Sequence, residues 1–225
     1  MADLPPGLDW LGATEKEHLA SLRVEKRRRE WLLGRWTAKQ ALLRAPDCQL
    51  AAKEPSQLEI LPSQKGQPTV YQLGQPDSIS LSLSHRAGSA LCMVWSGGSL
   101  GCDLELVEER SAGFVEDYFT ASEQSTIRAA GTEGAALMAN SLWSAKESLL
   151  KLLGIGLTAD TRLLTVQEGP EPSMEGWRPF TVSYAERSGL FRGWWLRREE
   201  WVLTVATDPA SGPPVEISKR VGEKG

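Results

Sequence analysis

Residues 101–105 carry two acidic side chains, Asp103 and Glu105, within a run that alternates like a β-strand. Residues i and i+2 of a strand face the same side of a sheet, so the two carboxylates are expected to lie close together and repel each other. A divalent cation relieves that repulsion directly, because carboxylate oxygens are preferred ligands of Mg2+. The same pattern is also typical of a solvated sheet edge, so both interpretations stay open at this point.

A second set of polar residues recurs at helical spacing between positions 142 and 153. Ser144, Glu147 and Lys151 follow one another three and four residues apart, as neighbours on one helix face do. Leucine and alanine at other positions form an apolar stripe, which predicts an amphipathic helix. A Glu–Lys pair four residues apart commonly stabilises its own helix by about 0.2 to 0.5 kcal/mol. Taken alone, the motif indicates helix support.

The third candidate is the segment 82–86, which ends a run of alternating apolar residues and serines. Its His85 is able to donate a hydrogen bond to phosphate, to form a nucleophilic pair with Ser84, or to act as a structural residue at a strand end. The G-x-x-x-x-G-K-[ST] loop that binds nucleotide phosphates is absent from the sequence. Any phosphate that this protein handles is therefore expected to be held by side chains and a metal.

A basic segment lies near the start of the chain. Between positions 23 and 39, seven basic residues, including Arg35 and Lys39, outnumber two acidic ones in an otherwise acidic protein. This pattern is typical of a solvated helix face, and it is equally the pattern of an anion site.

The elements that must position these residues follow from hydrophobic periodicity. Helical spacing is found over 14–43, 114–130 and 132–153, with Gly154 as a stop signal. Strand patterns are found over 58–61, 69–73, 79–84, 90–95, 99–106, 179–186, 193–198 and 201–207. We expect glycines 97 and 98 to form a hairpin turn between two of these strands. Helix followed by sheet in each half hints at a duplicated α+β unit, although the halves show no convincing residue-level repeat.

Length and composition limit the class of protein. A chain of 225 residues with 41% hydrophobic and 24% charged positions is able to bury a core without disulfides or a structural metal. The net charge of −4 argues against a protein that coats nucleic acid. Three cysteines without a C-x-x-C pair favour reduced thiols, and we find neither a secretory signal nor a long apolar run. We therefore expect a soluble cytoplasmic protein.

The order of the motifs resembles that of the 4'-phosphopantetheinyl transferase superfamily, in particular its larger, Sfp-like branch. The resemblance is carried by KGQP at 65–68, SLSH at 82–85, GCDLE at 101–105, YFT at 118–120 with Glu123, and WSAKES at 143–148 with Lys151. Segments 33–35 and 154–157 also look like that branch, so the similarity extends over residues 23–207. Five motifs in this order form a specific pattern, even though each alone is weak.

The resemblance implies an α+β fold of two pseudo-symmetric halves, each a small antiparallel sheet packed with helices, with the active site in the cleft between them. We expect 1–107 to form the half that binds coenzyme A, 108–207 to form the half with the metal and the catalytic helix, and 208–225 to be a flexible tail. The implied enzyme is a holo-[acyl-carrier-protein] synthase. It transfers 4'-phosphopantetheine from coenzyme A to a serine of an apo acyl or peptidyl carrier protein, depends on Mg2+ and releases adenosine 3',5'-bisphosphate.

The resemblance also implies roles for the candidate residues. Asp103, Glu105 and Glu147 are expected to be the Mg2+ ligands. Glu147 is further expected to remove the proton of the attacking serine, directly or through a water, and Lys151 to contact the attacked phosphate. Further contacts with coenzyme A are expected from Ser84, His85 and Lys146 at its phosphates, and from Arg35, Lys39 and Lys65 at the 3'-phosphate and adenine end.

Two other functions are compatible with parts of the sequence. A non-catalytic homologue that binds coenzyme A or a carrier protein is the first, but a pure binder gains nothing from clustering like charges beside Lys151. A nucleic-acid module that uses the basic segment on phosphates is the second, and the overall acidity argues against it. We expect a monomer with no nucleic-acid or membrane partner.

Overall fold

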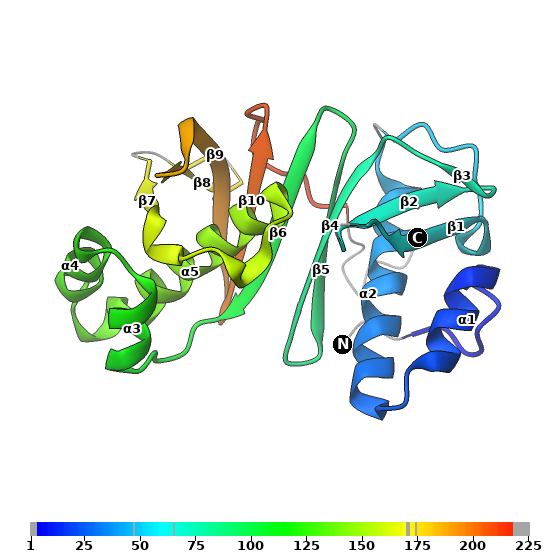
Figure 1. The fold of residues 1–225 in the computed structure, drawn as a ribbon, viewed down its shortest axis with the longest axis horizontal. Coiled ribbons are helices and arrows are strands. Elements are labelled where there is room, and N and C mark those ends of the chain that lie inside the picture. The colour runs from blue at the N-terminus through cyan, green and yellow to red at the C-terminus, as the bar shows by residue number, and fades with distance from the viewer. Residues whose placement is uncertain (1–3, 47, 65, 170–171, 174, 218–225) are drawn as a thin grey trace.

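The computed structural model describes residues 4–46, 48–64, 66–169, 172–173 and 175–217, and it has the predicted α+β class. Two α+β halves lie side by side along the long axis of the molecule (Figure 1). Three strands lie between the two groups of helices: β4 (Ser80–Arg86), β5 (Ser89–Trp95) and β6 (Ser99–Leu106). In the described part of the chain, no helix is both long and apolar enough to cross a membrane.

The N-terminal half places two helices on small antiparallel sheets. Helices α1 (Ala13–Ser21) and α2 (Glu25–Arg44) come first, followed by a sheet of β1 (Leu58–Pro62), β2 (Pro68–Gln72) and β3 (Gln75–Pro76), and then by the pair β4–β5. A short 3-10 turn, Pro55–Gln57, leads into β1. The helical spacing of Ala38 and Leu42 brings both onto the strands, where they are fully buried. The core of this half consists of Ala38, Leu42, Ala52, Leu58, Ile60, Val70, Ile79 and Leu81.

The C-terminal half places three helices on one antiparallel sheet of five strands. The helices are α3 (Ala112–Tyr118), α4 (Ala121–Ala129) and α5 (Gly131–Leu153). Two short 3-10 turns, Gly156–Thr158 and Thr161–Leu163, follow α5. The strands lie in the order β6, β10 (Trp201–Asp208), β9 (Arg187–Arg198), β8 (Arg178–Tyr184) and β7 (Leu164–Glu168). Helix α5 ends at Gly154 in the left-handed conformation, as predicted.

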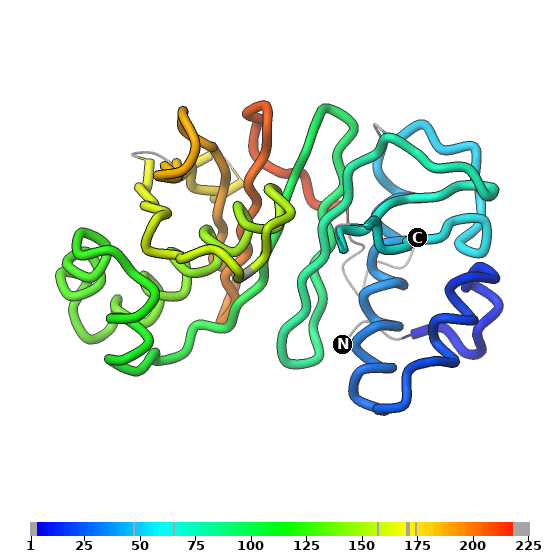
Figure 2. Tube along the Cα trace, in the orientation of Figure 1, coloured from blue at the N-terminus to red at the C-terminus, as the bar shows by residue number. Residues whose placement is uncertain are grey.

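The order of elements repeats between the halves. Two helices (α1 and α2, or α4 and α5) precede an antiparallel strand pair (β1–β2 or β7–β8) and then a hairpin (β4–β5 or β9–β10). Figure 2 shows the two long helices, α2 and α5, each beside the strands of its own half. The halves are therefore pseudo-symmetric.

Strand β6 belongs to the second sheet, which moves the boundary between the halves from the predicted residue 107. It pairs with β10 over its whole length, whereas β5 pairs with β4. The predicted hairpin between 90–95 and 99–106 is therefore wrong, and glycines 97 and 98 connect two different sheets. The chain passes from one half to the other at residues 96–98, because the partner that pairs with β6 lies at the far end of the sequence.

The segment after β10 is attached to the molecule as far as the structure describes it, in contrast to the predicted flexible tail. Trp194 donates a hydrogen bond from Nε1 to the Ser211 carbonyl at 3.1 Å. The Arg198 guanidinium pairs with both carboxylate oxygens of Glu216. Residues 209–217 therefore form a defined segment, and the rest of the predicted tail lies outside the described residues.

Candidate functional site

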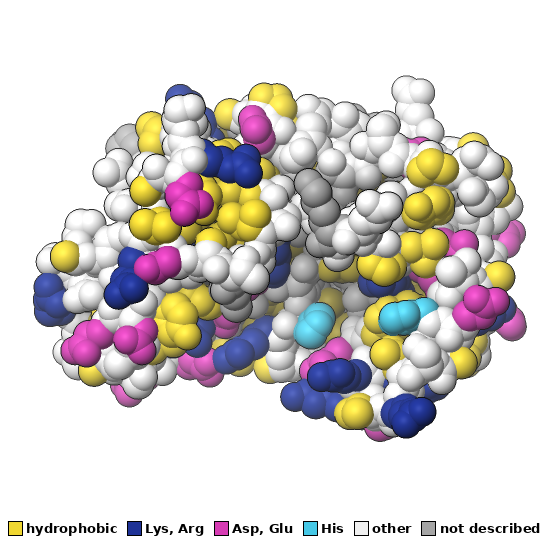
Figure 3. All heavy atoms as spheres, viewed as in Figure 1, with side chains coloured by type: hydrophobic (Ala, Val, Ile, Leu, Met, Phe, Trp, Pro, Cys, Tyr) yellow, Lys and Arg dark blue, Asp and Glu magenta, His cyan; other side chains and the backbone are white. Residues whose placement is uncertain are grey.

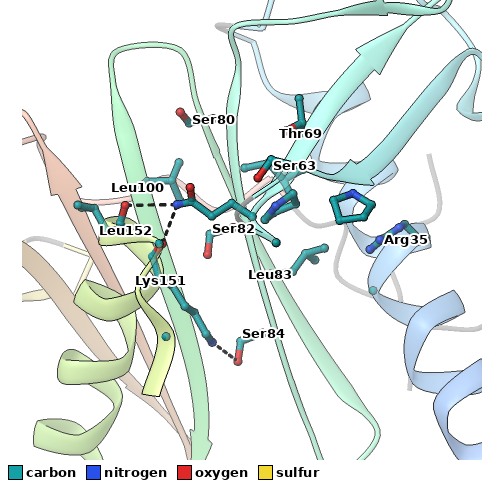
Figure 4. Close-up of a pocket in the computed structure, with 18 of the residues that line it drawn as sticks. Arg35, Ser63, Thr69, Ser80, Ser82, Leu83, Ser84, Leu100, Lys151 and Leu152 are labelled. Carbon is teal, nitrogen blue, oxygen red and sulfur yellow. Dashed lines mark hydrogen bonds between the residues drawn. The ribbon is translucent and has the colours of Figure 1, made fainter. Parts of the chain in front are cut away.

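A cavity of about 920 Å3 lies between the two halves. The C-terminal turn of α5 and the start of β6 form one wall, and β4, the β1–β2 connection and α2 form the other. The close-up in Figure 4 shows Lys151 and Ser84 meeting across this space, with Arg35 on the far wall. The molecule is visibly hollowed between its halves on this face (Figure 3).

Asp103 is the centre of the hydrogen bonds at one end of the cavity. Its Oδ1 accepts from Ser84 Oγ at 2.8 Å and from Lys151 Nζ at 2.7 Å, and its Oδ2 accepts from Ser144 Oγ at 2.8 Å. Only 2% of Asp103 is exposed. One buried carboxylate thus ties together β6, β4 and α5, the three elements that the sequence motifs occupy.

Gly101 explains why α5 lies so close to β6. A Cβ atom at this position would come within 2.0 Å of the Ser148 carbonyl oxygen and 2.4 Å of the Leu152 backbone nitrogen. Only glycine therefore permits the helix backbone to rest directly on the strand. This close packing brings Lys151 and Ser144 to Asp103, two residues further along β6.

Glu147 faces the same cluster from the helix. Its burial, together with the negative charge of Asp103, raises the pKa of this carboxyl from 4.5 to about 7, while the charge of Lys151 acts in the opposite direction. The Lys151 Nζ atom lies 3.9 Å from Glu147 Oε2. The acid on the helix and the acid on the strand are thus close enough to repel each other.

Glu105, the second acid of β6, is buried and paired with arginines. Arg110 Nη2 lies 3.0 Å from its Oε2, and Arg86 Nε lies 3.6 Å away. Burial and the charge of Asp103 raise the pKa of Glu105, and the two arginines lower it. Sequence reasoning included Arg86 in the segment 82–86 without giving it a role, and it missed Arg110, which follows the predicted strand 99–106 by four residues.

The carboxylates of Asp103, Glu105 and Glu147 are oxygen donors of the kind that Mg2+ prefers. In this arrangement, however, they do not form a complete metal-binding site. Among the described residues, no group of three histidine, cysteine or acidic side chains is arranged to hold a metal ion. Lys151 is paired with Asp103, and Glu105 is paired with its arginines. Burial, and after it the charge of Asp103, raises the pKa of Glu147, so a cation beside these two carboxylates would stabilise their charged forms. Asp103 and Glu147 therefore fit Mg2+ as oxygen donors, and Glu105 fits less directly.

Lys146 does not reach the cavity, which corrects the prediction of a phosphate contact. Its side chain is fully buried, and Nζ lies 2.7 Å from Glu123 Oε2. The same ammonium donates to the carbonyl oxygens of Tyr118 and Thr161, both at 2.9 Å. All three of its hydrogens are thus used inside the C-terminal half, so none is left for a phosphate.

Lys39 is buried as well, which corrects its predicted contact with the 3'-phosphate. Its Nζ lies 2.5 Å from Glu15 Oε2 and 2.9 Å from the Trp10 carbonyl oxygen. Neither Lys39 nor Glu15 has any exposed side-chain surface. The lysine therefore holds α2 to the segment before α1 and does not face a ligand.

The remaining predicted contacts line the cavity, with one exception. Arg35, Ser84 and His85 all lie on its wall. Lys65 lies outside the described residues. Sequence reasoning missed Gln67, which lines the cavity and donates from Nε2 to the Lys151 carbonyl oxygen at 3.1 Å. Its position in the KGQP motif was the available signal.

Comparison with known proteins identifies the family. The model of the 4'-phosphopantetheinyl transferase superfamily matches residues 9–94 and 99–206, and the gap falls where the chain passes from one half to the other. A phosphopantetheinyl transferase from Thraustochytrium sp. (strain ATCC 26185 / S-3) is 28% identical over 157 residues, which cover 64% of this chain and 52% of the relative. The chain thus spans about half the length of that curated relative. Because the family model matches most of the sequence, this protein belongs to the 4'-phosphopantetheinyl transferase superfamily.

Proposed function

We propose that this protein transfers the 4'-phosphopantetheine group from coenzyme A to a serine of an apo acyl or peptidyl carrier protein, as a holo-[acyl-carrier-protein] synthase. The observation that carries the proposal is the cluster of Asp103, Glu147 and Lys151, in which Lys151 lines the cavity and both Asp103 and Lys151 contact Ser84 of the N-terminal half. Phosphoryl transfer depends mainly on positioning and on stabilising charge, and a lysine among carboxylates beside an open cavity supplies both.

In the proposed reaction, this cluster removes a proton from the attacking serine and stabilises charge as the leaving group departs. The serine hydroxyl oxygen attacks the phosphorus next to the pantetheine arm, and the bond from that phosphorus to the bridging pyrophosphate oxygen breaks. Adenosine 3',5'-bisphosphate leaves with the bonding electrons, and the hydroxyl proton passes to Glu147, directly or through a water. Glu147 is placed to accept this proton because its carboxylate lies on the face of α5 that also carries Lys151, 3.9 Å away. Lys151 stabilises the negative charge on the attacked phosphate.

The walls of the cavity supply contacts for the rest of coenzyme A. Ser84 and His85, at the end of β4, are placed to hydrogen-bond pyrophosphate oxygens. Arg35, on the opposite wall, is a guanidinium that pairs well with the 3'-phosphate. The pantetheine arm would then extend toward Lys151, where the carrier serine reacts.

We propose Asp103, Glu105 and Glu147 as the protein ligands of Mg2+. A bound Mg2+ neutralises charge on pyrophosphate oxygens during the transfer. Asp103 and Glu147 are its main ligands in this proposal, and Glu105, which shares its charge with Arg110, supports them. We also propose that the enzyme works as a monomer, because the two halves of one chain supply both walls of the cavity. We propose the cytoplasm as its location.

The test is a transfer assay in which purified protein, coenzyme A, Mg2+ and several apo carrier proteins are mixed and each carrier is weighed by mass spectrometry. We expect at least one carrier to gain one phosphopantetheine at a single serine. Glu147→Gln and Asp103→Ala should each reduce the rate by at least about a hundredfold, the size typical for loss of a general base or a charge contact. Their circular dichroism should stay that of the wild type.

Glu109→Gln is the matched control, because this acid is exposed and lies outside the cluster. It should transfer at the wild-type rate. Near-normal transfer by both cluster variants would contradict the proposed mechanism. Tight coenzyme A binding with no transfer to any carrier, with or without Mg2+, would instead favour the non-catalytic homologue.

A further inference from the structure

Each half contains a buried pair of one glutamate and one lysine. In the N-terminal half Glu15 of α1 pairs with Lys39 of α2, and in the C-terminal half Glu123 of α4 pairs with Lys146 of α5. All four side chains have at most 2% of their surface exposed. Burying a charge is costly unless it is paired and hydrogen-bonded, so each pair is expected to satisfy its partners almost completely.

The two glutamates make the same backbone contacts. Glu15 accepts from the nitrogen of Gly12 at 3.1 Å and from Ile60 in β1 at 2.9 Å. Glu123 accepts from the nitrogen of Thr120, also three residues earlier, at 2.8 Å and from Val166 in β7 at 2.9 Å. Each acid therefore caps its own helix and holds the first strand of its own half.

The two lysines are equivalent as well. Lys39 and Lys146 each donate to the carbonyl oxygen of an aromatic residue, Trp10 or Tyr118, that lies five positions before the paired glutamate. The sequence around them repeats, with WTAKQALL at 36–43 and WSAKESLL at 143–150. The pairs are therefore a duplicated structural feature of the two pseudo-symmetric halves.

One residue of α2 breaks the symmetry. Four positions before the buried lysine, α2 has Arg35 whereas α5 has Leu142. The Arg35 Nε atom lies 3.9 Å from Glu15 Oε1, and it is buried without a hydrogen-bond partner among the described residues. The guanidinium lies over the Trp31 ring at 4.8 Å and lines the cavity. The first half thus adds a cation beside its buried pair, and it also has an acid, Glu59, before Ile60 where the second half has Thr165 before Val166.

The charges around Arg35 determine whether its guanidinium is available to a ligand. Glu15 is shared between Lys39, at 2.5 Å, and Arg35, at 3.9 Å, and a second acid, Glu59, acts on Lys39 and accepts from the backbone of α1, so the charge of Arg35 is balanced only in part by its nearest carboxylate. Burial lowers the pKa of Arg35 and the Glu15 carboxylate raises it, which keeps the group a cation in a partly desolvated wall. An incompletely balanced, partly buried guanidinium at a cavity wall is complementary to a dianionic phosphate.

We propose that Glu15 is a positioning residue that holds Arg35 in the cavity wall for recognition of the 3'-phosphate of coenzyme A, while Lys39 shares Glu15 and leaves part of the charge of Arg35 for the ligand. The proposal rests on the function proposed above for the cavity. It assigns to Glu15 a role in ligand recognition although Glu15 has no exposed surface and does not touch the ligand.

The experiment measures binding, so that it does not depend on catalysis. Calorimetry compares adenosine 3',5'-bisphosphate with adenosine 5'-monophosphate, and steady-state assays compare the KM of coenzyme A with that of dephospho-coenzyme A. In Glu15→Gln the preference for the 3'-phosphorylated ligand should fall by about tenfold, equivalent to about 1.4 kcal/mol. The kcat should change less than the KM.

Glu123→Gln is the matched control. It weakens the equivalent buried pair at a similar cost in stability, but Glu123 belongs to the half without an arginine at the matching position. Its preference for the 3'-phosphate should stay at the wild-type value, whatever happens to its kcat. Loss of preference in both variants, or in neither, would overturn the proposal.

Arg35→Lys covers the case in which Glu15→Gln does not fold. Arg35 is partly exposed, and lysine keeps its charge but lacks the Nε atom nearest to Glu15. The variant should fold and lose most of the preference, and an unchanged preference would overturn the proposal. If the wild type binds adenosine 3',5'-bisphosphate selectively but modifies no carrier, the proposed function fails while the role of Glu15 is still tested.

Discussion

Asp103 shows how a single side chain defines the site at the residue scale. It is buried, and it accepts hydrogen bonds from a serine in each half and from Lys151. A carboxylate with this many charge-assisted and neutral donors is held in one orientation. The pKa of Glu147, in contrast, is raised to about 7, first by burial and then by the charge of Asp103.

We predict that Glu147 makes the stability of the metal-free protein fall as the pH rises. Its folded pKa of about 7 exceeds the ordinary 4.5, so its stabilising contribution is complete below pH 4.5 and is lost as the pH rises through 7. After allowance for solvent screening, the loss between pH 5 and 8 should be about 2 kcal/mol. Denaturant unfolding of wild type and Glu147→Gln at both pH values measures it. An identical pH dependence in the two proteins would contradict the prediction.

The acidic residues of the site were predictable from the sequence, but the fate of the lysines was not predicted. Asp103 and Glu147 were proposed as site residues because five individually weak motifs occur in the order found in a known family. Lys146 was misassigned because it lies next to Glu147 in a motif, although Leu142 and Leu149, four before and three after it, placed it on the apolar stripe. Lys39 was misassigned because it belongs to the basic segment 23–39, although it lies three residues before the buried Leu42. The position of each lysine on its helix predicted its burial better than its distance along the sequence from a candidate site residue did.

The elements themselves were predicted more accurately than their pairing. The helix expected over 132–153 is α5 (Gly131–Leu153), and all of the strands expected from the pattern exist. The pairing of β6 was wrong because a hydrophobic pattern shows which face is buried but not which strand lies alongside. The repeat of WTAKQALL and WSAKESLL was present in the sequence, yet it became convincing only when both lysines were seen in equivalent pairs.

We predict that Gly101→Ala damages the site through the packing of α5 on β6. The added Cβ would overlap the Ser148 carbonyl oxygen, and backbone at this place has no room to move aside. The expected loss of stability is about 2 to 3 kcal/mol, and transfer activity should fall further than stability because Lys151 and Asp103 move apart. Thermal unfolding and the carrier assay measure the two effects.

Gly113→Ala is the control for that change. Gly113 lies in α3, and a Cβ there meets no atom within 4 Å. Because alanine is the better helix former, this variant should be as stable as the wild type or more stable by about 0.5 to 1 kcal/mol. If Gly101→Ala were equally harmless, close contact between helix and strand would not be what positions the cluster.

At the scale of the whole molecule, residues 209–217 complete the pseudo-symmetry on the face opposite the site. The last residue of β4, Arg86, pairs with Glu105 of the strand that follows β5. The last residue of β9, Arg198, pairs with Glu216 of the segment that follows β10. This segment borders a second groove of about 860 Å3, which α2, β5 and β9 also line. The segment therefore lies beside a groove that residues of both halves line.

We predict that this segment stabilises the protein through apolar contact more than through the ion pair. Arg198 and Glu216 are 50% and 43% exposed, and such pairs contribute less than about 1 kcal/mol. Pro213, Pro214 and Ile217 are half-buried, so removing residues 213–225 should cost about 1 to 2 kcal/mol. Arg198→Ala should cost clearly less than the truncation in thermal unfolding, and amide exchange should increase in α2 only in the truncated chain. Equal destabilisation by the two changes would mean that the ion pair, and not the apolar cover, holds the halves together on this face.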